Sequence, residues 1–375
     1  MNSVTVVGAG PAGLASALTL AKAGWSVEVY EKNAAVGQRF HGDFQGLENW
    51  SHEEDILQTL TRLGLQVNFW IRPFHQATFY DAQLRPHELQ TRHPLFYLVR
   101  RGDVEGSLER GLYRQALEAG VQFHFGSPVN RVEGPAIIST GPHFGDAICV
   151  GYLFETDLPD GAWCIVSQQV APRGYSYLLV AAGQATISSC QFTDLPRWKT
   201  HLEATVTAFR SLHPFEMKNA RPFSGYGNIY LQRHLQVGQK RYVGEAAGLQ
   251  DALWGFGMRY ALTSGVLAAR SLTDGQEEYP ASIERELKAH QQASLVNRLL
   301  WEALGDRGFS YFIRKFEAPR DARPLLGKVG GPHWLKNLLY PIARWRLSRR
   351  GRYRYTSCDG EDCTCVWCTC ERSRL

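Results

Sequence analysis

The sequence contains no run of about 20 apolar residues, the length that a membrane-spanning helix needs. It also lacks a strong charge of one sign, because 41 basic and 36 acidic residues leave a net charge of +5. No internal repeat is present, and the first residues lead into a predicted strand rather than a basic, cleavable leader. These absences argue against a membrane-spanning protein, give no support to nucleic-acid binding, and lead us to expect a cytoplasmic location.

Methionine is scarce, with three residues, whereas ten tryptophans contribute to an aromatic fraction of 12%. The apolar fraction of 44% supports a substantial core, and 375 residues suffice for a layered α/β body with two lobes.

The most informative stretch lies at the start of the chain. A β-branched run at 4–7 stops at the turn GAGPAG (8–13), 14–23 has the pattern of a helix, and a second predicted strand at 27–30 ends at Glu31. A glycine-rich turn between strand and helix, followed by an acid at the next strand end, is the context of a dinucleotide site.

Each part of this turn has a physical role. Gly8 permits the tight turn, Gly10 lets the backbone approach a pyrophosphate, and Gly13 lets helix and strand pack closely. The start of the helix offers unpaired N–H groups to negative charge, and Glu31 is suited to accept hydrogen bonds from an adenosine ribose. The expected contacts of the dinucleotide in this region also include Ala12 and Lys32.

We expect an α/β fold in which a Rossmann-like domain is interrupted by an antiparallel sheet that binds substrate. Residues 32–49 are predicted to be a loop, and a helix is predicted to begin near Ser51. The predicted division assigns 1–66, 98–147 and 236–275 to the dinucleotide-binding domain, 67–97 and 148–235 to the substrate domain, 276–355 to a basic helical region, and 356–375 to a Cys-rich tail.

Three stretches in this order resemble the FAD-dependent oxidoreductases of the geranylgeranyl reductase type, within the p-hydroxybenzoate hydroxylase superfamily. They are the opening GAGPAG with Glu31, LVRRGDVEGSLERGLYRQALEAGV at 98–121, and YVGEAAGLQDALWGFGMRYALTSGVLAA at 242–269. The resemblance covers roughly residues 1–300. It implies that FAD is the dinucleotide.

The resemblance further implies that Arg101 lies against the cofactor and that the late glycine turn closes over the ribityl chain and flavin. N–H groups around Gly257 and Met258, at a predicted helix start, are suited to stabilise negative charge on a reduced flavin. The remaining expected FAD contacts are Arg39, Val129, Gly244, Glu245 and Gly255.

The chain departs from the family pattern at three places. Glu245 stands where the late motif usually has Asp, and His41 precedes Gly42 where the reductases often have a Cys-Gly pair, which argues against reduction chemistry that depends on that cysteine. The family's Gly-Tyr-x-Trp-x-Phe-Pro segment is only echoed at 174–179, which has neither the tryptophan nor the proline. Separately, the segment 163–166 does not supply the Trp-x-Trp-x-Ile-Pro sequence of flavin-dependent halogenases, which argues against that activity.

The candidate catalytic residues are His41, Tyr175 and Tyr177. An imidazole beside the flavin is suited to donate a proton near neutral pH, but a loop histidine bonded to backbone fits the sequence equally well. The two tyrosines are expected to line an apolar substrate pocket or to belong to the core, and the same alternatives apply to Trp163, Trp254 and Phe256.

The resulting prediction is an FAD-dependent oxidoreductase that passes electrons through FAD to reduce or dehydrogenate an apolar organic substrate. The alternatives are an FAD-dependent monooxygenase and a flavin electron-transfer protein. Because a second GxGxxG motif is missing, the electron donor is expected to be transiently bound NADPH or an acidic protein such as ferredoxin or flavodoxin.

The region from Arg307 to Arg354 carries thirteen Lys and Arg residues and two acids, mixed with Trp, Tyr and Leu at near-helical spacing. This composition is typical of a peripheral membrane contact or a docking surface for an acidic partner, and it also fits a solvated basic face.

Five cysteines crowd the tail, at Cys358, Cys363, Cys365, Cys368 and Cys370. Dense thiols in a cytoplasmic protein predict zinc or an iron–sulfur cluster first, disulfides or redox-active thiols second, and a disordered reactive tail third. The spacing matches neither common ferredoxin pattern, so the metal stays open.

Overall fold

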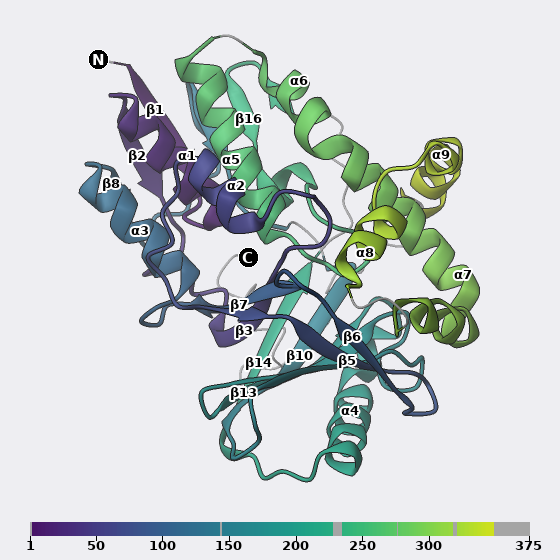
Figure 1. Ribbon diagram of the computed structural model, residues 1–375. Coiled ribbons are helices and arrows are strands. Elements are labelled where there is room, and N and C mark those ends of the chain that lie inside the picture. The colour runs from purple at the N-terminus through teal and green to yellow at the C-terminus, as the bar shows by residue number, and fades with distance from the viewer. Residues whose placement is uncertain (1, 143–144, 228–234, 276, 318–320, 349–375) are drawn as a thin grey trace.

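The computed structural model describes residues 2–142, 145–227, 235–275, 277–317 and 321–348, and the cysteines of the tail lie outside these ranges (Figure 1). Its first layer is a six-stranded sheet in the order β15-β16-β9-β1-β2-β8, parallel except for the β15–β16 pair. The strands are β1 (Ser3–Val7), β2 (Ser26–Tyr30), β8 (Gln122–His124), β9 (Ala136–Ile138), β15 (Gln236–Val237) and β16 (Lys240–Tyr242).

Helices α1 (Pro11–Lys22), α3 (Leu108–Glu118) and α5 (Met258–Thr273) pack together beside this sheet (Figure 1). A side chain at Gly265 would place its Cβ 2.3 Å from the carbonyl oxygen of Ala12, so α1 and α5 approach closely only because this position is glycine. The parallel sheet and its glycine-rich first turn are those predicted from the sequence.

The second sheet has seven strands in the order β14-β10-β13-β12-β11-β5-β6, antiparallel except for the β11–β5 pair. Helix α4 (Trp198–Leu212), preceded by a 3-10 turn at Leu195–Arg197, covers one face, where Phe209 packs into a buried cluster with Leu178 and Ile187 (Figure 1). The strands are β5 (Gln76–Tyr80), β6 (Pro86–Gln90), β10 (Ala147–Glu155), β11 (Gly161–Ile165), β12 (Tyr175–Ala181), β13 (Gln184–Gln191) and β14 (Lys218–Gly227).

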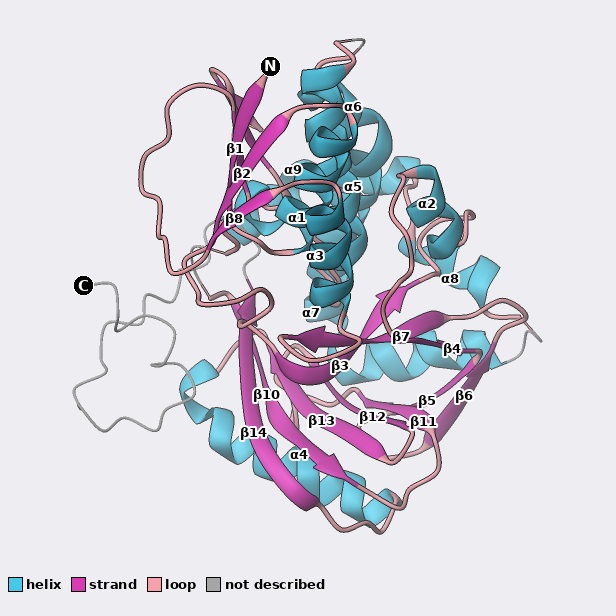
Figure 2. Cartoon of the chain, turned by 90° about the vertical axis from the view of Figure 1, so that its left-hand side faces the viewer, coloured by secondary structure: helices cyan, strands magenta, loops and turns pink. Residues whose placement is uncertain are grey.

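A three-stranded antiparallel sheet, β3-β7-β4, lies above the free face of the seven-stranded sheet (Figure 2). It consists of β3 (His41–Glu48), β4 (Ile71–Phe74) and β7 (Phe96–Gly102). The prediction of a loop over 32–49 is therefore wrong at β3. This segment contains two glycines, which favour a loop, but its pairing with β7 makes it a strand. Helix α2 (Ile56–Arg62) also begins later than expected, because the Asp55 carboxylate accepts a hydrogen bond from the N–H of Leu57 and caps the helix there.

The chain continues through helices that flank both lobes (Figure 1). They are α6 (Tyr279–Ile283), a π-helical turn at Glu284–Lys288, α7 (Ala289–Glu317), which is broken at Gly305, α8 (Arg323–Gly330) and α9 (Trp334–Ser348). Among the described residues, no helix is long and apolar enough to cross a membrane. The predicted α/β class, with an inserted antiparallel sheet and a helical C-terminal region, is confirmed.

Candidate functional site

A continuous cavity of about 850 Å³ lies between two lobes, one built on the six-stranded sheet and the other on the seven-stranded sheet. At one end its wall is the glycine-rich turn with Gly10 and Glu31, and at the other it is the face of the seven-stranded sheet opposite α4, which includes Tyr177. The volume lies toward the upper end of the roughly 300–1,000 Å³ of small-molecule sites. The cavity also begins where parallel strands end, as ligand sites of such sheets do.

The turn between β1 and α1 has the geometry that a pyrophosphate needs. Gly8 has a positive φ of 102°, and a Cβ there would lie 2.3 Å from the carbonyl oxygen of Ser139, so no larger residue fits. A Cβ at Gly10 would meet no atom within 4 Å, because this residue faces the cavity at the start of α1. The N–H groups of the helix start thus remain approachable.

Glu31 is buried at the end of β2 and is tied to this turn. Its carboxylate accepts hydrogen bonds from the N–H of Ala9 at 2.8 Å and from the N–H of Asn33 at 2.9 Å. A carboxylate has about four acceptor positions, so it retains capacity for a sugar hydroxyl. Of the other predicted contacts in this region, Ala12 and Lys32 also line the cavity, whereas Gly13 packs beneath the turn.

Arg101 comes from β7 and is held in place by a buried carboxylate. Its Nε donates to Glu109 Oε1 at 2.7 Å, one Nη donates to Gln45 at 2.7 Å, and the guanidinium lies 4.0 Å from the ring centre of Phe40. Arg101 lines the cavity, as do Gln45 and Phe40. The arrangement fixes a positive charge in the cavity wall, where the sequence predicts a cofactor contact.

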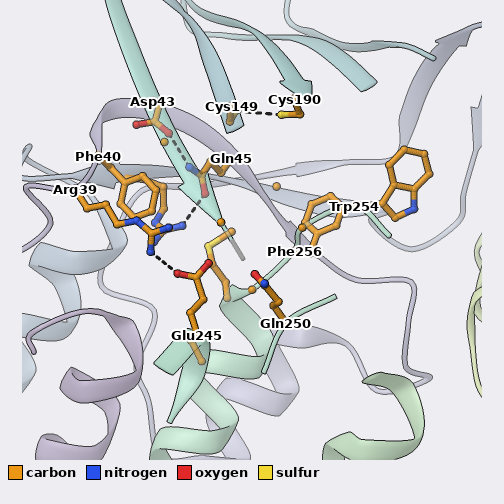
Figure 3. A pocket seen from close by; sticks show the side chains of 18 of the residues that line it. Arg39, Phe40, Asp43, Gln45, Cys149, Cys190, Glu245, Gln250, Trp254 and Phe256 are labelled. Carbon is orange, nitrogen blue, oxygen red and sulfur yellow. Dashed lines mark hydrogen bonds and ion pairs between the residues drawn. The ribbon is translucent and has the colours of Figure 1, made fainter. Parts of the chain in front are cut away.

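Arg39 and Glu245 form an ion pair between the segment before β3 and the late glycine turn (Figure 3). Arg39 also donates to the carbonyl oxygen of Tyr226, so it joins three segments distant in sequence. Gly244, immediately before Glu245, has a positive φ of 56°. Glu245 is one methylene longer than the Asp expected at this position, and its carboxylate reaches across the cavity wall to the guanidinium of Arg39.

Helix α5 begins at Met258, and its N-cap residue, Gly257, provides no side-chain cap; both residues line the cavity. Gly255, Gly257 and Met258 all lie in this wall, so the positive end of the helix dipole is presented to the cavity. Val129 is different: it follows the edge strand β8 and does not belong to the cavity lining among the described residues.

The predicted catalytic residues come from two sheets. His41, at the start of β3, is exposed, lines the cavity edge, and its ring centre lies 6.5 Å from that of Phe223. Its backbone N–H donates to Asp43 at 2.9 Å. Tyr175 and Tyr177 lie on β12 with their rings 6.2 Å apart and line the inner part of the cavity.

Burial raises the pKa of both tyrosines well above the ordinary value, so they stay neutral near pH 7. The Tyr175 hydroxyl donates to the carbonyl oxygen of Trp254 at 2.5 Å, and the Tyr177 hydroxyl lies 3.6 Å from the Cys149 sulfur. The other aromatic residues expected in the pocket, Trp163, Trp254 and Phe256, also line the cavity.

The sequence reasoning missed several cavity residues that carry carboxyl or thiol groups. Asp251 and Asp43 place carboxyl groups in the wall. Cys149 and Cys190 place thiols on the sheet face (Figure 3). Burial raises the pKa of Asp251 to about 6, while its carboxylate accepts the N–H of Trp254 at 2.6 Å. The position of Asp251 within the late YVGEAAGLQD stretch was the available signal; no local pattern marks the cysteines.

The residues present fit FAD. The open Gly10 position and the acidic end of β2 suit a pyrophosphate and an adenosine ribose, and the uncapped start of α5 suits a ring that gains negative charge. The predicted metal ligands lie outside the described residues, and within the described ranges no cluster of three or more His, Cys, Asp or Glu residues forms a metal site.

Comparisons with known proteins agree with this fold. Residues 6–48 match the family of NAD(P)-binding Rossmann-like domains. A comparison with curated protein sequences finds no match.

Similar solved structures include a geranylgeranyl bacteriochlorophyll reductase-like protein from Thermoplasma acidophilum, at 17% identity and a TM-score of 0.70, covering 93% of this chain and 99% of that one. A flavoprotein/dehydrogenase from Cytophaga hutchinsonii shares 13% identity with a TM-score of 0.66, covering 92% and 99%. The flavin-dependent brominase Bmp2 shares 16% identity with a TM-score of 0.64, covering 93% and 99%. The predicted resemblance to FAD-dependent oxidoreductases is thereby confirmed at the level of the fold.

Proposed function

We propose that this protein is an FAD-dependent oxidoreductase that reduces or dehydrogenates a partly apolar organic substrate. The observation that carries the proposal is the continuity of the cavity, which joins the glycine-rich turn at Gly10 to the aromatic sheet face at Tyr175. A dinucleotide bound at the turn has room to extend toward that face. Bound FAD supplies acceptance and donation of an electron pair.

In this proposal the chain's own residues position the cofactor and exclude water. Gly10 and Glu31 hold the adenosine and pyrophosphate half, whereas Arg101 and the start of α5 face the other half. A fixed cation and an uncapped helix start stabilise negative charge without reorganising during the reaction. Met258, which begins α5, also lines the cavity.

The substrate end of the cavity is mainly apolar. Phe79, Phe96 and Leu179 contribute to its wall, and Tyr175 and Tyr177 stay neutral there. An apolar wall with few polar groups favours a substrate that buries a hydrocarbon portion. Asp251 is the carboxyl group suited to exchange a proton near neutral pH, because burial brings its pKa to about 6.

The test is purification of the full chain followed by a visible absorbance spectrum and anaerobic reduction with NADH, NADPH or reduced ferredoxin, in parallel. We expect flavin bands that bleach rapidly with one donor. Protein that shows no flavin bands after incubation with excess FAD and gel filtration contradicts the proposal. Oxygen consumption coupled to NADPH oxidation, with a hydroxylated product, identifies a monooxygenase instead.

We further propose that helix α9 rests on an anionic membrane surface. One side of α9 packs on the body through Ala343 and Leu347, which are buried. Its other side leaves large apolar side chains exposed, with Trp334 at 63%, Leu338 at 67% and Trp345 at 55%. This set, together with Leu335 and Ile342, is called the α9 apolar face.

The charge of α9 supports an anionic membrane as the partner of the α9 apolar face. The 15 residues of α9 contain Lys336, Arg344 and Arg346 and no acid, and both arginines are exposed. A helix of this length is too short to span a bilayer, but tryptophan with arginine is typical of a helix that lies in the interface of an anionic membrane.

A further inference from the structure

A pair of thiols on the cavity wall is not used by the function proposed above. Cys149 on β10 and Cys190 on β13 are directly opposite each other in the antiparallel register, and their sulfur atoms lie 3.1 Å apart. Both residues line the cavity, and Figure 3 places them on sheet strands across the cavity from Glu245 and Gln250. The pair therefore faces the space that the cofactor and substrate share.

The register explains why the two thiols meet. Residues opposite each other in an antiparallel pair point to the same face, with Cα atoms about 4.5–5.5 Å apart. This separation lies within the range of about 4.4–6.8 Å seen in disulfides, whose S–S bond is about 2.05 Å. The sulfur atoms of Cys149 and Cys190 must approach by about 1 Å to form this bond.

The neighbours of the pair leave one side accessible. In the same row across the sheet, Cys149 is opposite Gly225 on β14, and Cys190 is opposite Tyr175 on β12. A Cβ at Gly225 would meet no atom within 4 Å, so the row is open beside Cys149. Cys149 is half-buried, whereas Cys190 is 8% exposed and lies deeper.

Hydrogen bonding makes the two thiols unequal. The Cys190 thiol donates to the Cys149 sulfur, which lowers the pKa of Cys149 and raises that of Cys190. Ser188 Oγ lies 2.9 Å from the Cys149 sulfur and adds to the lowering. One thiol with a lowered pKa beside one with a raised pKa is the asymmetry of redox-active cysteine pairs.

We propose that Cys149 and Cys190 form a redox pair that cycles between dithiol and disulfide and exchanges its electrons with bound FAD. On oxidation two S–H bonds break, one S–S bond forms, and two electrons and two protons pass to FAD, giving its reduced form. In reverse, reduced FAD returns them and restores both thiols. This inference rests on the proposed function for the identity of the electron acceptor.

The first test uses the full FAD-loaded chain and reads the cysteines directly. The protein is equilibrated anaerobically in mixtures of reduced and oxidised dithiothreitol, free thiols are alkylated, and peptides are analysed by mass spectrometry. We expect a Cys149–Cys190 linked peptide whose fraction follows the redox poise. Full alkylation of both residues in every mixture overturns the inference, and protein that carries no flavin overturns the proposed function while leaving the disulfide measurable.

The second test measures coupling to the flavin by anaerobic titration with dithionite. Pre-oxidised wild type is expected to consume two more electrons per FAD before complete bleaching than the Cys149→Ser and Cys190→Ser variants. The tail cysteines contribute equally to all three proteins and cancel in the difference. Cys164→Ser, which changes another cavity cysteine, is the matched control and is expected to behave as wild type. Equal uptake by wild type and both variants overturns electron exchange with FAD.

Discussion

Two nitrogens of Arg101 bond to one buried carboxylate oxygen of Glu109: both Nε and an Nη of the arginine lie 2.7 Å from Glu109 Oε1. The second oxygen, Oε2, accepts the N–H of Gly102 at 3.0 Å. The glutamate side chain is 1% exposed and the arginine side chain 6%. This pair fixes both the charge and the orientation of the cation that faces the cavity, and it joins β7 to the start of α3.

Removing the carboxylate leaves that cation buried without its partner. We expect Glu109→Ala to lower the free energy of unfolding by about 3–5 kcal/mol, because an uncompensated buried charge is strongly unfavourable. Urea denaturation measures the change. The double variant Glu109→Leu with Arg101→Met is the control and is expected to recover much of the loss, since the charge is removed together with its partner. A double variant as unstable as the single one contradicts this account.

Closing the open position at the start of α1 should remove cofactor without unfolding the chain. Gly10 has a φ of −77°, which any residue adopts, and a side chain there enters the cavity. We expect Gly10→Val to weaken FAD binding by about tenfold or more, about 1.4 kcal/mol, with little change in thermal stability of the FAD-free protein. Flavin fluorescence quenching measures the affinity.

The matched control for this change is Gly330→Ala in α8, another glycine around which a Cβ meets no atom within 4 Å and which does not line the cavity. Its affinity for FAD should equal that of wild type. An unchanged affinity in Gly10→Val shows that the cofactor does not approach this turn.

The half-buried His52 is expected to lower the free energy of unfolding as the pH falls. Burial, followed by the charge of Arg259, lowers its pKa to about 3, and its ring stacks on that of His290 at 3.9 Å. The unfolded chain, with a histidine pKa near 6.5, takes up this proton first as the pH falls. Stability from this group is therefore complete above pH 6.5 and declines below it by up to about 1.4 kcal/mol per pH unit.

Chemical denaturation between pH 7 and pH 5 checks whether the free energy of unfolding falls as the pH is lowered. His52→Phe keeps a ring against His290 but cannot bind a proton, so its stability should fall less steeply over this interval. His93→Phe removes an exposed histidine elsewhere and should leave the slope of wild type nearly unchanged. Parallel slopes in wild type and His52→Phe would show that His52 is not the responsible group.

The α9 apolar face predicts binding to lipid vesicles. Wild type should co-sediment with vesicles that contain phosphatidylglycerol and should bind vesicles of phosphatidylcholine several-fold more weakly, since Arg344 and Arg346 favour anionic lipid. Replacing Leu338 and Trp345 by Glu should abolish sedimentation without loss of stability, because both side chains are exposed.

The control for the vesicle experiment is Leu304→Glu, which changes an apolar side chain that is 61% exposed on α7 rather than α9. This variant should sediment like wild type. If wild type fails to bind the anionic vesicles, the membrane contact is wrong, and a saturable complex with ferredoxin would assign the face to a protein partner.

Local backbone requirements explain what could be predicted. The turn at 8–13 was identifiable because Gly8 needs a positive φ and Gly10 needs an open position, and both demands appear directly as glycine. The acid at Glu31 has a fixed distance along the chain from that turn, so its place beside Ala9 also followed from the sequence.

Features that depend on pairing between distant segments could not be predicted in the same way. The strand at His41–Glu48 contains two glycines and forms by pairing with β7, whose residues lie 48 to 61 positions later in the chain. Cys149 and Cys190 are 41 residues apart, and only the β10–β13 register brings them together. Similarly, Asp55 caps α2, although Ser51 offered an equally good starting signal.

The inner end of the cavity includes Leu326, which belongs to α8 rather than to either of the two large sheets. Leu326 also packs against the aromatic cluster under the three-stranded sheet. The depth available to a substrate is thus bounded by a helix that follows both lobes in sequence. In the function proposed above, changes in α8 are expected to lengthen or shorten the accepted molecule while the walls at the glycine-rich turn and at the start of α5 stay as they are, so that substrate range and redox chemistry could evolve separately.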